Sequence, residues 1–332
     1  MPVQSSILET TDVIYKPVGS VDQSDLEFRV PTDNDAYIDP NIKLYIRGKL
    51  TKANGTNLDE TDFMAVNNNF VYSLFSPCNI TLNGVTITPV TDIYNYRSFF
   101  ETILTYGSDA VVSHLTNGFW YLDGRDLLPC DPMAPDAKIR GFVNRCNTIK
   151  QIKEVEMYGR LHSGICNVPR FLPPGVRIQI KLTKAKSNCY LFNKDAESNN
   201  AFKFLDAQLI VNRVRPNPTI LLAHNPTLGI GAIASFNLTR VELKTFTFSS
   251  GSQSLSIKNA VLQPIPKRLL FSMVKNTDFL GSVTTNPYFF RHYDINHFAL
   301  HVYGKKIPAV VLSFALEHEK TSVMGYRTLF KA

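Results

Sequence analysis

Short segments in which apolar and polar side chains strictly alternate constrain the fold of this chain more than any other feature. In residues 42–50 (IKLYIRGKL), the side chains of Ile42, Leu44, Ile46 and Leu50 fall on one side, and cationic and polar side chains fall on the other. Residues 176–184 (VRIQIKLTK) repeat this character about 134 positions later. A period of two predicts strands with one buried and one solvated face. The repetition suggests a duplicated β unit.

Further strands are expected along most of the chain. Their predicted positions are 26–30, two alternating runs within 67–82, 111–115, 119–122, 204–213, 240–248, 268–274, 298–303 and 309–316, the last two joined by a short turn at 304–306. No convincing amphipathic helix is found between residues 204 and 316. Many short strands with spaced turn signals favour a mainly β fold of sandwiches or jelly rolls.

One segment, 67–107, combines a hairpin with the best helical pattern of the sequence. Asn83 and Gly84 predict a tight hairpin turn. Apolar residues at helical spacing follow from Ile93 to Leu104, with Asp92 as the expected N-cap and Gly107 as the stop. We therefore expect one helix of about four turns set among strands.

Length and turn residues suggest two domains and an arm. A chain of 332 residues has a prior of about two domains. Turn residues are dense between about 123 and 155, including the Asp-, Pro- and Gly-rich tract 124–137. We expect a polar N-terminal arm over 1–24 that orders against a neighbour, a first roll over 25–150 and a second over 151–332.

Composition excludes several classes of protein. The chain is 44% hydrophobic and 19% charged, which is ordinary for a globular protein, and its net charge of +7 comes from scattered Lys and Arg. The most apolar window, 219–236, is interrupted by His224, Asn225 and Pro226, so no membrane span is expected. The N-terminus has no basic or apolar signal region, so we expect the protein to stay on the side of the membrane where it is made.

The sequence contains no motif that supports catalysis. Phosphate-binding, nucleophile-elbow and zinc-protease patterns are all missing, and the five cysteines are widely spaced, which favours reduced thiols. His292, His297 and His301 lie within ten residues, but positions 297 and 301 of a strand are about 13 Å apart. We therefore predict no enzyme activity, no metal and no cofactor.

Several segments in a fixed order resemble one protein family. In the first half these are YIDPNIKLYIRGKLTKANG, VNNNFVYSLFSPCNITLNG and YNYRSFFETILTYG. In the second half they are GRLHSGICNVPRFLPPGVRIQIKLTK, LLAHNPTLGIGAIASFNLTRVELKTFTF, PIPKRLLFSMV and NPYFFRHYDINHFALHVYGKKIP. Together, over about 26–330, they are similar to the hexon-like major capsid proteins of Polinton (Maverick) elements and adintoviruses.

This resemblance implies a double jelly roll, with two eight-stranded antiparallel sandwiches and a short helix in a connection of the first. It also implies homotrimeric, pseudo-hexameric capsomers that tile an icosahedral shell around DNA in a virion, beside a minor capsid or penton protein. The chain departs from the family at 164–166 and at the Pro173-Pro174 loop. It also stops at YRTLFKA, where relatives continue, so it is either a short member or has an incomplete second roll.

For a capsid subunit, structural and functional residues nearly coincide. Arg97 and Glu101 are one helical turn apart and able to pair, and basic residues beside turns are candidates for non-specific contact with packaged DNA. The candidate structural or interface positions are Asn68, Asn83, Gly84, Tyr96, Arg97, Glu101, Gly159, His162, Arg170, Arg240, Pro266, Lys267, Arg268, Asn286 and Pro287.

Two other classes of function stay open. A β-sandwich module that binds glycans or nucleic acid, including a domesticated capsid relative, would bind its ligand as a monomer. An enzyme on a jelly-roll scaffold would need clustered His and carboxylate ligands. The host, the shell size and the compartment of assembly are not encoded in any recognisable motif.

Overall fold

The computed structural model describes residues 5–52, 54–59, 64–88, 93–123, 140–149, 154–193, 199–230, 233–262 and 265–313. The chain divides into two compact units. The first comprises residues 1–243 and 281–286, and the second comprises residues 244–280 and 287–332. The mainly β fold class is confirmed, because antiparallel sheets dominate the first unit and a β-hairpin forms part of the second.

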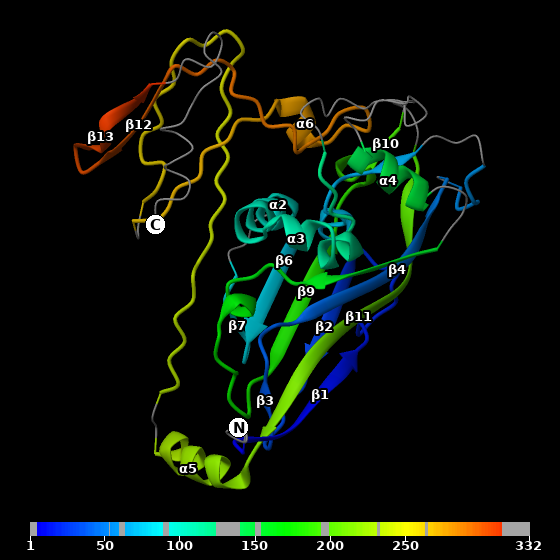
Figure 1. Ribbon diagram of the computed structural model, residues 1–332, viewed down its shortest axis with the longest axis vertical. Helices are drawn as coiled ribbons and strands as arrows, with labels where there is room; N and C mark the ends of the chain where they lie inside the picture. Colours follow the sequence, from blue (N-terminus) through cyan, green and yellow to red (C-terminus); the bar gives the residue numbers. More distant parts are fainter. Residues whose placement is uncertain are drawn as a thin grey trace. The chain divides into compact units, whose positions relative to one another are not determined.

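The first unit contains two antiparallel sheets that lie face to face (Figure 1). One sheet has the order β1 (Ile7–Tyr15), β11 (Ala201–Pro216), β4 (Lys43–Thr51) and β8 (Val155–Arg160), with β3 (Tyr37–Ile38) also paired to β11. The other has the order β2 (Asp25–Val30), β9 (Ile178–Lys184), β6 (Phe75–Leu82) and β7 (Val85–Thr86). Two short strands, β5 (Ala65–Val66) and β10 (Leu191–Phe192), pair separately.

The pairing of these strands defines a jelly roll. Among the eight strands of the two sheets other than β3, the first pairs with the last (β1 with β11), and the second with the seventh (β2 with β9). The third pairs with the sixth (β4 with β8), and the fourth with the fifth (β6 with β7). This nested pairing is that of an antiparallel strip folded over on itself, so residues 7–216 form one complete roll.

The apolar faces of the two sheets build a single core. Leu44 and Ile46 of β4 and Ile180 and Leu182 of β9 are fully buried in the same cluster, although their strands belong to opposite sheets. The strands predicted at 42–50 and 176–184 are therefore confirmed. The duplicated unit inferred from their likeness is corrected, because each strand supplies one wall of the same sandwich.

Pairing across residue 150 also corrects the expected domain limits. Strands β8, β9 and β11 follow that residue and pair with β4, β2 and β1, which precede it. The boundary expected at 150/151 thus falls inside one roll. Residues 7–15, expected to belong to an arm over 1–24 that orders against a neighbour, form strand β1 against β11 of their own chain.

The connection between β7 and β8 carries several helices. It contains α2 (Tyr94–Thr105), α3 (Ser108–Val111), the 3-10 helix η1 (His114–Gly118) and α4 (Arg140–Ile149). The predicted helix is confirmed as α2, while its expected cap Asp92 and the tract 124–137 lie outside the described residues. The strand predicted at 111–115 is wrong, because these residues end α3 and begin η1, and 119–122 form no strand.

Other short helices replace or interrupt predicted strands. The first alternating run expected near residue 70 is a helical turn, α1 (Phe70–Ser73), which is buried on all sides, so alternation carries no information there. Single turns η3 (Ile165–Asn167) and η4 (Ser187–Cys189) flank β9. Helix α5 (Pro218–Gly229) follows β11. It has no Asp, Glu, Lys or Arg and no polar face, so its sequence shows no amphipathic pattern.

The second unit contains helix α6 (Asn276–Leu280) and the hairpin of β12 (His297–Val302) with β13 (Lys305–Ser313). The hairpin is confirmed, but its turn lies at Tyr303 and Gly304, both with positive φ, and not at 304–306, because Lys305 and Lys306 already pair within β13. The strands predicted at 240–248 and 268–274 are wrong: within the described parts of 233–275 no residue is in a helix or strand. Alternation alone makes no strand without a neighbour to complete the ladder.

Candidate functional site

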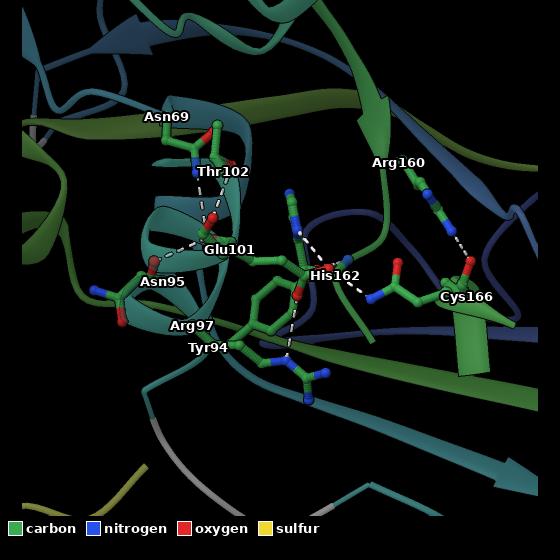
Figure 2. A network of polar contacts seen from close by, with 11 residues as sticks. Asn69, Tyr94, Asn95, Arg97, Glu101, Thr102, Arg160, His162 and Cys166 are labelled. Carbon is green, nitrogen blue, oxygen red and sulfur yellow. Dashed lines mark hydrogen bonds and ion pairs between the residues drawn. The ribbon is translucent and has the colours of Figure 1, made fainter. Parts of the chain in front are cut away.

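A network of polar side chains joins helix α2 to the segment that follows β8. Tyr94, Arg97 and Glu101 project from α2, and His162 comes from the following segment (Figure 2). Asn167 of the same segment contacts Glu101. Sequence reasoning named Arg97 and Glu101 as a possible pair and His162 apart from them, and the structure brings all three together. The network therefore fixes the position of α2 on the first unit.

The buried face of α2 is polar at its centre. Ser98 and Thr102 are almost inaccessible, and their hydroxyls donate to the backbone carbonyls of Asn95 and Ser98. The side-chain amide of Asn69 donates to the hydroxyl of Ser98 at 3.4 Å. Because each hydroxyl has a partner, this face is buried without a large desolvation cost.

Glu101 is the centre of the network. Its Oε1 accepts a hydrogen bond from the Asn167 side-chain amide at 2.7 Å and lies 3.5 Å from His162 Nδ1. Its Oε2 lies 3.8 Å from Nε of Arg97. Burial by itself raises the pKa of Glu101, but the hydrogen bonds from His162 and Asn167 and the nearby cationic groups outweigh burial and lower the pKa. Glu101 is therefore ionised at neutral pH.

We expect Glu101→Gln to lower the free energy of unfolding by about 2 kcal/mol at pH 7, since hydrogen bonds to a charged group are lost. The folded-state pKa is depressed, so this contribution is present above the ordinary value near 4.5 and disappears as the pH falls through the folded-state pKa. Urea unfolding of both proteins between pH 7 and pH 3 measures the difference. Glu9→Gln, at a pair more than half exposed, is the control and should change little. A difference that does not shrink in acid would contradict this role of the carboxylate.

The network contains the residue types of a thiol nucleophile system but not its electrostatics. Burial raises the pKa of Cys166 to about 12, so its thiol stays protonated at neutral pH. Burial likewise raises the pKa of Tyr94 well above its ordinary value. The Tyr94 hydroxyl accepts a hydrogen bond from the backbone N–H of His162 at 3.1 Å. These contacts are suited to holding segments in place.

Gly159 of β8 lacks a side chain and so leaves space for the ring of Tyr72. A Cβ atom at this position would lie 2.1 Å from the hydroxyl oxygen of Tyr72. The Tyr72 ring packs edge to face on His162, with ring centroids 4.5 Å apart. The glycine thus allows Tyr72 to lie between β8 and the imidazole.

Other candidate residues have structural roles away from this network. The side chain of Asn68 holds the backbone of Tyr121 through two hydrogen bonds: it donates to the Tyr121 carbonyl and accepts from the Tyr121 N–H. The predicted turn is confirmed, since Asn83 and Gly84 both have positive φ and the Asn83 side chain accepts from the backbone N–H of Arg177 at 2.8 Å. Tyr96 is buried on α2.

The remaining candidates do not gather into one site. Arg240 pairs with Glu242 at 2.8 Å, and Arg170 is exposed. Pro266, Lys267 and Arg268 are exposed, whereas Asn286 and Pro287 are buried. No DNA-facing group is defined by these positions.

Sequence reasoning missed another buried polar contact of the first unit. Arg145 of α4 makes a bidentate contact with Asp123, at 3.0 and 2.8 Å, and donates from Nε to the carbonyl of Val66. Only 1% of the Arg145 side chain and 5% of the Asp123 side chain are exposed. Arg145 follows Asn144 in the polar helix sequence RGFVNRCNTI, which indicates neither its burial nor its partner.

Metal and thiol chemistry find little support in the described residues. They contain no group of three or more His, Cys, Asp or Glu side chains placed to hold a metal ion. His292 contacts Asp294 at 3.0 Å, and His297 and His301 are exposed on β12. Cys78, Cys146, Cys166 and Cys189 are free thiols, and Cys130 lies outside the described residues. Within the described part of the chain, no helix is both long and apolar enough to span a membrane.

Comparison with known proteins finds distant similarities. No family model matches the sequence. The chain is 21% identical over 256 residues to the uncharacterized protein F54H12.2 of Caenorhabditis elegans, covering 76% of this chain and 58% of that protein. At this identity the relative does not assign a family.

Similar solved structures come from viral capsids. A Sputnik virophage chain has a TM-score of 0.40 and 11% identity, covering 65% of this chain and 50% of that chain. The PBCV-1 VP54 structure has a TM-score of 0.43 and 10% identity, with 67% and 46% coverage. The Faustovirus major capsid protein has a TM-score of 0.39 and 9% identity, with 69% and 58% coverage. This chain spans about half the length of the proteins that it matches.

Proposed function

We propose that this chain is a structural, non-enzymatic capsid subunit of the hexon-like major capsid class. The observation that carries the proposal is the nested strand pairing of residues 7–216, which makes a complete jelly roll. The ordered sequence resemblance over 26–330 supports the finer assignment to Polinton or adintovirus capsid proteins. Under this proposal the protein is located in the virion.

The proposed domain arrangement follows from the roll. Residues 7–216 form the first jelly roll, and the chain after α5 contributes strands to a second. Alternating segments at 240–248 and 268–274 carry exposed large apolar side chains, among them Phe246, Phe248 and Phe271. These two segments form no strand in the structure, so the proposed second roll is supported by the β12–β13 hairpin and by the sequence resemblance over 26–330.

An exposed apolar surface on the helices between β7 and β8 is the proposed contact between copies. Ile103 and Leu104 of α2 are about half exposed, and Val112 after α3 is 80% exposed. Apolar groups clustered on a surface are common at sites of association. In the proposed assembly, three copies close a ring and the rings tile a shell, which a minor capsid or penton protein completes. Scattered cationic groups contact the packaged DNA without sequence preference.

Light scattering after size exclusion, followed by negative-stain microscopy, tests this proposal. We expect a mass near three times 37.4 kDa and pseudo-hexagonal particles. The variant Ile103→Asp/Leu104→Asp should remain folded, because both side chains are exposed, and should lose association. Val85→Asp, at a 67% exposed position of the β6–β7 hairpin, is the matched control and should associate normally. A wild-type monomer that binds a glycan or DNA would instead favour the binding-module alternative.

A further inference from the structure

Strand β1 is attached to its sheet almost entirely through one neighbour. It lies at the sheet edge and pairs with β11 from Ile7↔Pro216 to Tyr15↔Leu209. Within β1, only Tyr15 packs against the apolar core of the roll. Leu8 and Ile14 are 61% and 56% exposed, so the strand buries little apolar surface in its own subunit.

Most side-chain contacts of β1 are polar and solvated; the exception is Tyr15 at its C-terminal end, whose hydroxyl accepts hydrogen bonds from the largely buried Arg213 at 3.0 and 2.9 Å. Asn212 donates to Asp12 at 3.0 Å, and Arg215 contacts Glu9 at 3.2 Å, with both charged side chains more than half exposed. Each exposed pair of this kind contributes about 0–1 kcal/mol. A strand held by a backbone ladder and such pairs opens more easily than the strands that build the core.

The segment after β1 provides a hinge. Residues 16–20 contain Pro17 and Gly19 and no helix or strand; the chain is held again at Val18, whose N–H donates to the carbonyl of Glu27 at 2.8 Å, and at Val21, which packs against the core. The nine residues of β1 extend about 30 Å when stretched. A pivot at residues 16–17 would carry the whole strand away from β11 of its own subunit.

We propose that β1 is exchanged between copies of this chain, so that β1 of one subunit pairs with β11 of its neighbour. Every contact made within one subunit is then remade between two subunits, which makes exchange a low-cost way to link them. The exposed Leu8 and Ile14 travel with the strand and become part of the junction. This inference rests on the proposed self-association.

Cysteine pairs across the β1–β11 ladder test the exchange in the full chain. Asp12 and Asn212 are register partners whose side chains touch, so Asp12→Cys and Asn212→Cys place two thiols opposite each other. The two single variants are refolded together and oxidised. Exchange predicts a covalent dimer of one chain of each kind on a non-reducing gel, which neither single variant nor the wild type forms alone. The double variant Asp12→Cys/Asn212→Cys should give linked multimers.

The control is a ladder inside the roll. Arg47 and Glu156 are register partners of β4 and β8, so the double variant Arg47→Cys/Glu156→Cys should link only within one chain. An assembly of trimer mass in which Asp12→Cys/Asn212→Cys also links only within one chain overturns the exchange and leaves the capsid proposal standing. A monomer by light scattering, linked internally, overturns both.

Discussion

Replacing Asp123 by asparagine is expected to lower the free energy of unfolding by about 3–5 kcal/mol, since a buried charge loses its only formal counterion among the described residues. Asp123 accepts two hydrogen bonds from the guanidinium of Arg145, and the Arg145 side chain is 1% exposed. Asparagine keeps the shape of the side chain but removes the negative charge. Arg145 is then left charged in a site that water does not reach.

Urea unfolding monitored by circular dichroism measures this effect. The control is Lys16→Ala, which removes an ion pair whose lysine is 56% exposed and should cost less than about 1 kcal/mol. The double variant Arg145→Met/Asp123→Leu should recover much of the lost stability, because apolar residues of similar volume replace buried pairs well. A loss below about 1 kcal/mol for Asp123→Asn would show that the pair is hydrated in solution.

Replacing Phe70 by alanine is expected to cost about 3–5 kcal/mol, because it leaves a large cavity in the core. Phe70 is fully buried, and its ring lies 5.3 Å from that of Phe202 and 5.9 Å from those of Phe119 and Tyr190, measured between centroids. These rings come from η1, η4 and β11 or the residues beside them. The cavity therefore lies where the connections that contain α1, η1 and η4 pack against the sheet of β11.

Thermal and urea unfolding check this second expectation. Phe70→Leu fills part of the cavity and should cost clearly less than Phe70→Ala. Phe171→Ala removes the same atoms from a side chain that is 42% exposed, so it should change stability little. Equal losses for Phe70→Ala and Phe171→Ala would contradict the buried position of Phe70.

Local sequence patterns were sufficient to predict those strands, helices and turns that a few adjacent residues determine. Strands β4 and β9 alternate, and β11 alternates over most of its length despite a register shift between Phe204 and Asp206, because one face meets the core and the other meets water. Helix α2 and the Asn83–Gly84 turn are equally local, since helical spacing and positive φ are properties of a few adjacent residues. These elements were predicted close to their observed positions.

Non-local pairing explains what the sequence could not predict. Residues 7–15 look like a polar arm until β11, some 200 residues later, supplies their ladder partners. Conversely, 240–248 alternates like a strand, yet no described strand lies beside it. Similar strands in opposite sheets imitate a duplication, because both sheets need one apolar face.

The polar network was predictable only in part. The i,i+4 spacing of Arg97 and Glu101 suggested a pair on one helix, and their ion pair is present at 3.8 Å. The stronger contact of Glu101 is with Asn167, which is 66 residues away. No pattern in the sequence indicates that the segment after β8 packs on α2.

The nested pairing of the roll has a consequence for the order of folding during synthesis. Strand β11 lies between β1 and β4, so this sheet lacks its central member until residue 216 has been made. Until then both β1 and β4 present unpaired backbone edges, which are templates for wrong pairing. Contacts so distant along the chain also form slowly. A ribosome-bound chain that ends before residue 201 should therefore be held by chaperones, and one that extends well past residue 216 should be released.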